Sequence, residues 1–150
     1  MKNLALFSAI ILSVIAPLRA EPFPAPLQSA LDKYLQIQTA LAADSVKGVA
    51  TSATELAAVA KASSGVVPEA VGVHAEALAK TTDIKTAREA FKPLSATLVA
   101  TLTAQKTKSG QYYEAFCPMA KASWIQSGQK ISNPYFGPAM LSCGEIREAL

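Results

Sequence analysis

The chain is poor in the side chains that most enzymes use for chemistry. Its 150 residues include one histidine, one tryptophan and two cysteines, and only 17% of them are charged. The single histidine, His74, leaves no Ser/His/Asp or Cys/His/Asn set that we can assemble, so nucleophilic catalysis has little support. The sequence has no glycine-rich phosphate loop. We therefore expect this protein not to be an enzyme.

Excess charge of one sign is also scarce once the N-terminus is set aside. Removing residues 1–20 would remove two cations, Lys2 and Arg19, and no acid, which lowers the formal net charge from +3 to +1. No run of lysine and arginine remains that would follow a phosphate backbone. We therefore expect no nucleic-acid partner.

Long apolar runs are limited to the first residues. Leu4–Ile15 is apolar apart from small polar residues, follows the basic Lys2, and is ended by Pro17 and the small residue Ala20. This order is typical of a secretory signal peptide, and the run is shorter than the roughly 20 residues that a spanning helix needs. We predict a signal peptide over residues 1–20, a periplasmic or secreted protein, and no membrane span after cleavage. An uncleaved N-terminal anchor is the alternative, because Arg19 is unusual beside a cleavage point.

The remaining chain divides into three parts. Residues 21–26 contain three prolines and are expected to form an extended leader. Residues 27–105 are alanine-rich, and their apolar positions recur at steps of three and four, which predicts four amphipathic helices. Residues 106–150 hold most of the aromatic residues among prolines and glycines, with one or two short strands expected, for example around 111–116. We predict an all-α single domain over residues 27–150, in which an antiparallel four-helix bundle carries an aromatic-rich, loop-rich C-terminal unit packed on it.

Individual side chains predict details of these helices. Asp44 and Asp83 are expected to be the N-cap residues of the second and fourth helices. Pro93, inside the fourth helix, predicts a kink or a local adjustment. His74 lies on the apolar stripe of the third helix, so we interpret it as a buried, hydrogen-bonded core residue. We interpret Arg88 as a surface or inter-helix charge.

Sulfur is concentrated near the C-terminus. Each cysteine has a methionine within three residues, as Cys117-Pro118-Met119 and Met140-Leu141-Ser142-Cys143. Cys-x-Met in an extended segment puts both side chains on one face, and Met-x-x-Cys does so in a helical turn. Thiolates and thioethers are soft ligands that select Cu(I) and related ions, whereas methionine is not a usual zinc ligand. The metal ligands that we predict for Cu(I) or Ag(I) are Cys117, Met119, Met140 and Cys143, with Trp124 as a cover over the ion.

The same residues allow simpler interpretations, which stay open. A Cys117–Cys143 disulfide would close a loop of roughly 26 residues and contribute about 3 to 4 kcal/mol, and thiols of exported proteins tend to oxidise. Met119 and Met140 would then fill gaps near aromatic residues, and Trp124 would be a packing anchor. A pair close enough to chelate one ion is also close enough to oxidise, so the two states need not exclude each other.

Several segments resemble a domain-of-unknown-function family of exported bacterial proteins. The resemblance lies in Leu35–Asp44, Arg88–Ser95, Tyr113–Ala120, Trp124, Asn133–Gly137 and Met140–Glu145. Members occur as free periplasmic proteins and as a C-terminal extension of CusB-type adaptors of copper/silver efflux systems. The resemblance implies heavy-metal handling, with matching positions at Cys117, Met119, Met140 and Cys143. This chain has no adaptor hairpin or barrel sequence, so it would be a stand-alone version.

Two functions of different classes are consistent with this sequence. The first is a periplasmic soft-metal-binding protein that acts as a metallochaperone, a buffer or an accessory to heavy-metal efflux, with an efflux adaptor or another periplasmic protein as partner. The second is a disulfide-stapled interaction module that binds such an adaptor or another envelope protein without metal. A thiol-based redox enzyme is less well supported, because the cysteines are not arranged as Cys-x-x-Cys.

Overall fold

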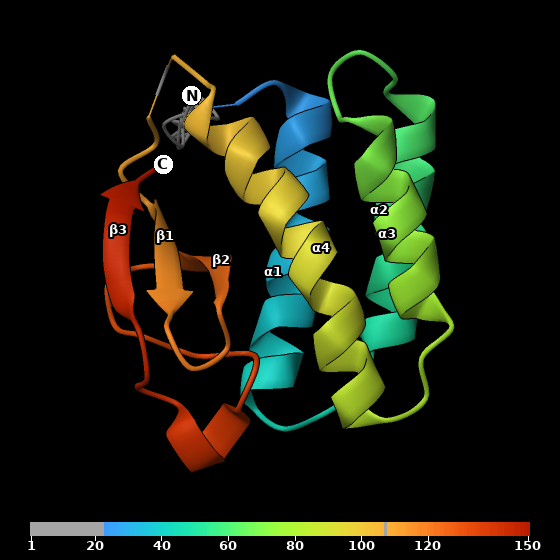
Figure 1. Cartoon of the computed structure of the whole chain (residues 1–150). Coiled ribbons are helices and arrows are strands. Elements are labelled where there is room, and N and C mark those ends of the chain that lie inside the picture. The colour runs from blue at the N-terminus through green and yellow to red at the C-terminus, as the bar shows by residue number, and fades with distance from the viewer. Residues whose placement is uncertain (1–22, 107) are drawn as a thin grey trace, which may run out of the picture.

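The chain forms four helices followed by a small sheet (Figure 1). A computed structural model describes residues 23–106 and 108–150. The helices are α1 (Ala25–Ala42), α2 (Val49–Ala62), α3 (Glu69–Ala79) and α4 (Ile84–Thr103). The strands are β1 (Tyr112–Cys117), β2 (Ala122–Ser127) and β3 (Glu145–Ala149), and a short 3-10 helix, η1 (Gly137–Met140), precedes β3. The signal peptide predicted over residues 1–20 lies outside the described residues.

Helix α4 begins as its sequence predicts. The carboxylate of Asp83 is the N-cap and accepts hydrogen bonds from the backbone N–H groups of Lys85 and Thr86, each at 3.0 Å. These bonds satisfy two of the donors that a helix start leaves unpaired. Pro93 lies inside α4 without ending it, and its carbonyl accepts a hydrogen bond from the hydroxyl of Thr97 at 3.0 Å.

Helix α2 begins later than the sequence suggests. We expected Asp44 to be its N-cap, but the N-cap is Gly48, whose φ is 81°. Asp44 lies instead in the turn after α1, with its own φ at 58°. Its carboxylate accepts a hydrogen bond from the guanidinium of Arg88 on α4 instead of capping α2.

Helix α1 begins inside the predicted leader. Its first residue is Ala25, with Pro24 as the N-cap residue and Pro26 in the first turn, where a missing N–H costs no hydrogen bond. The extended leader is therefore wrong for its last two residues. Phe23 is buried and stacks on Tyr112, with the ring centroids 6.2 Å apart. Within the described ranges, no helix is both long and apolar enough to cross a membrane.

The prediction of an all-α fold is wrong, because the C-terminal unit contains a three-stranded antiparallel sheet. The strand order is β2-β1-β3. The strand expected around residues 111–116 is β1, and it pairs with β2 from Tyr112↔Ser127 to Cys117↔Ala122. Strand β3 pairs with the other edge of β1, with Phe116 opposite Glu145. The residues of β3 favour helices in isolation, so its strand conformation comes from pairing with β1.

The sheet and the helices share one core. Helices α1 and α4 lie between the sheet and the α2–α3 pair, and β2 is the strand that contacts α4 and α1 (Figure 1). Fully buried side chains meet at this contact, among them Tyr34, Phe91, Trp124 and Ile125. Tyr34 stacks on Phe91 with the ring centroids 4.9 Å apart. The C-terminal unit is thus a sheet joined to the helices by an apolar core.

Two tyrosine hydroxyls cover the edge of β2 that faces the helices. Tyr34 accepts a hydrogen bond from the backbone N–H of Ile125 at 3.1 Å and is hydrogen-bonded to the hydroxyl of Ser95 at 2.6 Å. Tyr135 donates to the carbonyl of Ser123 at 2.6 Å. Burial raises the pKa of both tyrosines, so both stay protonated and satisfy backbone groups that would otherwise be unpaired in the core.

Candidate functional site

The two cysteines meet at one end of the sheet. Cys117 ends β1, and Cys143 lies two residues before the strand that pairs with β1. Their Sγ atoms are 2.9 Å apart and both residues are free thiols. Cys117 is fully buried, whereas Cys143 is partly exposed. The two thiols are therefore in contact in the structure but do not form the disulfide bond that was one of the two interpretations of the sequence.

The environment makes the two thiols unequal. Burial acts to raise the pKa of the Cys117 thiol, but hydrogen bonds from the Cys143 thiol, the backbone N–H groups of Ala120 and Met119 and the side chain of Asn133 outweigh it. The net pKa of Cys117 is therefore below its ordinary value. The pKa of the Cys143 thiol is raised, because this thiol donates a hydrogen bond to Cys117, is partly desolvated and lies beside the negative charge on Cys117. The first proton lost by the pair leaves a thiolate on Cys117 that Cys143 stabilises as donor.

The two methionines flank this pair in different ways. Met119 lies in the turn between β1 and β2, and its backbone N–H acts to lower the pKa of both cysteine thiols. Its side chain is 67% exposed, so it does not fill a gap in the core. Met140 ends η1 and is partly buried, and its carbonyl accepts a hydrogen bond from the N–H of Cys143 at 3.0 Å. The four predicted ligands thus belong to two adjoining turns.

Trp124 packs beneath the segment that carries Cys143. The indole is fully buried, donates to the Gln126 side chain at 3.0 Å and meets the Tyr135 ring edge to face at 5.9 Å. A Cβ atom built on Gly144 would lie 2.8 Å from the indole ring. Trp124 is therefore a packing anchor for the backbone beside Cys143, and its role as a cover over an ion stays a prediction.

Asn133 links the segments on either side of the pair, and the sequence interpretation did not single it out as a site residue. Its amide Nδ2 donates to the carbonyl of Cys143 at 2.7 Å, and its Oδ1 accepts from the backbone N–H of Tyr135 at 2.8 Å. Its own N–H donates to the carbonyl of Leu141 at 2.9 Å, and the side chain is fully buried. The dipeptide Asn-Pro is a turn signal in which the Asn side chain bonds its own backbone, and this signal was present in the sequence.

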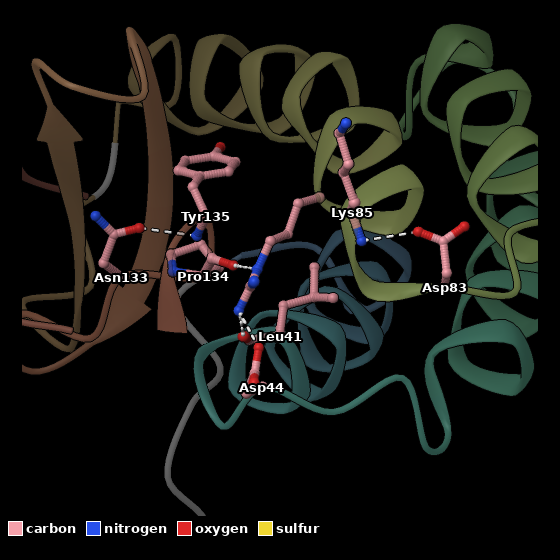
Figure 2. Close-up of polar contacts among 8 residues, drawn as sticks. Leu41, Asp44, Asp83, Lys85, Asn133, Pro134 and Tyr135 are labelled. Atoms are coloured by element: carbon pink, nitrogen blue, oxygen red, sulfur yellow. Dashed lines mark hydrogen bonds and ion pairs between the residues drawn. The ribbon is translucent and has the colours of Figure 1, made fainter. Parts of the chain in front are cut away.

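Arg88 fastens the Asn133 loop to the helices. Its Nε donates to the carbonyl of Pro134 at 2.9 Å, and its Nη2 donates to the carbonyl of Leu41 at 3.0 Å and to the carboxylate of Asp44 at 2.9 Å. Figure 2 shows Pro134, Leu41 and Asp44 converging on the side chain that joins them. The arginine side chain is only 14% exposed. It is therefore not a surface charge, and it connects α4 to the end of α1 and to the loop that leads to Cys143.

The donor set suits a soft ion better than a hard one. Across residues 23–106 and 108–150, no three His, Cys, Asp or Glu side chains form a group that could hold a metal ion. His74 is partly exposed on α3, which packs on α2 and α4, so it is not the buried residue that we expected and it does not join the cysteines. The available donors are two thiols and, from the flanking turns, two thioethers. That chemistry matches Cu(I) or Ag(I) and not the usual zinc or calcium sites.

Comparison with known proteins identifies a family but no function. Residues 30–110 match the family described as "Protein of unknown function (DUF3347)". No curated protein and no solved structure matches the chain. The matched region contains most of the four helices and ends before β1, so the cysteine pair lies beyond it. Because the match covers more than half of the 150 residues, the chain belongs to the DUF3347 family of proteins of unknown function.

Proposed function

We propose that this protein is exported and binds Cu(I) or Ag(I), acting as a metallochaperone, a buffer or an accessory to heavy-metal efflux. The observation that carries this proposal is the contact between the two thiols, whose Sγ atoms are 2.9 Å apart. Two thiolates more than offset the charge of a soft monovalent cation and bind it strongly, and thioethers add ligands that need no deprotonation. Cys117 and Cys143 are the anchoring ligands in this proposal, and Met119 and Met140 complete the set.

Binding requires a small opening of the pair. Two sulfurs that each bind one ion at about 2.3 Å would lie about 3.8 Å apart at a tetrahedral angle and about 4.6 Å apart in a line. Cys117 is held in β1, whereas Cys143 follows the exposed residues Leu141 and Ser142. The side chain of Cys143 is therefore the one that turns outward, which moves its sulfur by about 1 Å or more when the ion enters.

The resemblance of the C-terminal segments supports the same ligand class. The segments around Cys117, Asn133 and Cys143 resemble those of exported proteins associated with CusB-type copper/silver efflux adaptors. An efflux adaptor or another periplasmic protein is the partner that we propose on this basis. The DUF3347 family itself has no assigned function, so the resemblance supports the class of ligand and does not describe a mechanism.

Anaerobic titration of the reduced protein with Cu(I) against a competing chelator tests the proposal. We expect one ion per chain, and we expect Cys117→Ala or Cys143→Ala to weaken binding by on the order of a hundredfold, because each removes a thiolate ligand. Met119→Leu and Met140→Leu should each weaken it by about tenfold, since a thioether is lost at nearly constant volume. His74→Ala is the matched control and should leave affinity unchanged.

Absence of Cu(I) binding by the reduced wild-type protein would contradict the proposal. Unchanged affinity in both methionine variants would remove Met119 and Met140 from the ligand set and leave a dithiol site.

A disulfide-stapled interaction module is the second candidate, and one observation favours it. The 2.9 Å between the sulfurs is shorter than the separation that a single bound ion imposes, so the pair is closer to the geometry of oxidation than to that of chelation. In that case Cys117 and Cys143 would staple the C-terminal unit, and an efflux adaptor or another envelope protein would bind its surface. The same titration separates the two candidates, because the module needs no ion and predicts no Cu(I) binding after reduction.

A further inference from the structure

We propose that Cys117 and Cys143 form a directional thiol–disulfide exchange couple, in which external disulfides and thiols react at Cys143 and Cys117 is the internal, resolving sulfur. This activity goes beyond metal binding and does not depend on it. It rests on the contact between the two sulfurs and on their unequal exposure.

Access decides which sulfur an external reagent meets first. Cys143 is partly exposed in the segment between η1 and β3, whereas Cys117 is fully buried at the end of β1. Exchange proceeds by in-line attack of a thiolate on an accessible sulfur. Cys143 is therefore the entry point in both directions.

The surroundings of Cys117 suit the internal role. Its sulfur contacts that of Cys143 and has no exposed surface. An external reagent therefore reaches it only through Cys143, and its attack on the Cys143 sulfur is intramolecular. The distance of 2.9 Å to the Cys143 sulfur means that little movement separates the dithiol from the disulfide.

The oxidation takes two steps and moves two electrons. Cys143 passes the proton that it shares with the Cys117 thiolate to Cys117 across their contact, and the resulting Cys143 thiolate attacks a low-molecular-weight or protein disulfide, which forms a mixed disulfide on Cys143 and releases one thiolate. Cys117 then attacks the Cys143 sulfur of that mixed disulfide, which forms the Cys117–Cys143 bond and expels the second thiolate. The external disulfide is reduced to two thiols while the pair loses two protons and two electrons. An external dithiol reverses both steps, attacking Cys143 and expelling Cys117.

Reaction of the reduced, metal-free protein with an aromatic disulfide, 5,5′-dithiobis(2-nitrobenzoate), tests this order. Wild type should release two equivalents of thionitrobenzoate per chain and retain no adduct, because Cys117 resolves the mixed disulfide. Cys117→Ala should release one equivalent and retain one adduct on Cys143. Cys143→Ala should react on the order of tenfold or more slowly, because its remaining sulfur is buried. Peptide mapping should find the Cys117–Cys143 bond in the wild-type product.

Unfolding in urea provides the control for this test. Both single-cysteine variants should react at the same rate when unfolded. A difference between their reaction rates in the native state is then due to the fold. Equal native rates for the two variants would overturn the direction of exchange. A wild-type product that retains an adduct, with no internal bond, would overturn the couple itself. Because the reaction contains no metal, a failure here leaves the Cu(I) titration untouched, and a protein that exchanges but binds no Cu(I) would refute only the metal proposal.

Discussion

At the scale of single residues, the backbone beside Cys143 is held by a close approach that only glycine permits. Gly144 has a φ of 142°, and a Cβ atom there would lie 2.8 Å from the indole of Trp124 and 2.9 Å from the carbonyl oxygen of Phe116. Both neighbours belong to the sheet, so neither moves without disturbing strand pairing. The position of Cys143 relative to Cys117 therefore depends on a missing side chain one residue away.

Gly144→Ala should destabilise the protein by about 3 kcal/mol, because it combines an unfavourable φ with an overpacked contact. Gly110→Ala is the matched control. Gly110 also has a positive φ, 66°, but nothing lies within 4 Å of a Cβ built there. That variant should lose only about 1 kcal/mol from the backbone alone. Urea unfolding measures both changes, and equal losses would show that the contact with Trp124 is unimportant.

At the scale of elements, the edge of β2 is satisfied by side chains from outside the sheet. Tyr34 of α1 supplies the acceptor for Ile125, and Tyr135 supplies the donor for Ser123. A strand edge facing an apolar helix layer would otherwise carry unpaired backbone groups at a cost of about 1 to 3 kcal/mol each. Apolar burial holds the sheet on the helices, and these two hydroxyls satisfy backbone groups that this burial separates from water.

Tyr34→Phe should therefore lower the free energy of unfolding by about 1 to 3 kcal/mol, because it leaves the N–H of Ile125 and the hydroxyl of Ser95 without their partner. Tyr113→Phe is the control, since its hydroxyl donates to the Gly110 carbonyl at 3.2 Å in an exposed setting that water can replace. It should change stability by less than about 0.5 kcal/mol. Thermal or urea unfolding compares the two, and a Tyr34→Phe protein as stable as Tyr113→Phe would contradict this account of the docking.

Strand β3 marks the limit of prediction from sequence at this scale. Four of its five residues, including Glu145 and Glu148, are common in helices, and polar and apolar residue types do not alternate strictly along Glu-Ile-Arg-Glu-Ala. Its conformation follows from pairing with β1, which lies about thirty residues earlier in the chain. Helix α4 is the opposite case, because its apolar spacing and the Asp83 cap are both local and both are found in the structure.

At the scale of the whole molecule, one partly buried arginine connects the family-defining helices to the cysteine-bearing unit. Arg88 of α4 donates to the carbonyls of Leu41 and Pro134, groups that are far apart in sequence. Asn133, next to Pro134, in turn bonds the carbonyl of Cys143. The geometry of the cysteine pair is therefore linked to the helices through two residues that carry no sulfur.

Arg88→Met should destabilise the protein by about 2 to 3 kcal/mol, because it keeps the length of the side chain but removes the donor of the Pro134 carbonyl, the second donor of the Leu41 carbonyl and the cation beside Asp44. It should also speed hydrogen exchange at the backbone of Asn133 and Tyr135, which loses its attachment to the helices. Lys92→Met on the same helix is the control, since Lys92 forms an exposed pair with Glu89 and should contribute less than about 0.5 kcal/mol. Exchange at the Asn133 loop that is the same in both variants would refute the connection.

The sequence by itself determined the four helices, the strand at β1 and the sulfur-bearing residues of the candidate site, because helical periodicity, caps and residue chemistry are local properties. Only the tertiary structure decided that the C-terminal unit is a sheet, that Cys117 is buried and Cys143 accessible, and that Arg88 and Asn133 hold them. These features depend on pairing between segments distant in the chain and on which backbone groups burial leaves in need of a partner. The two cysteines could be picked out in the sequence, but the distance between their sulfurs and the difference in their exposure arise from the fold.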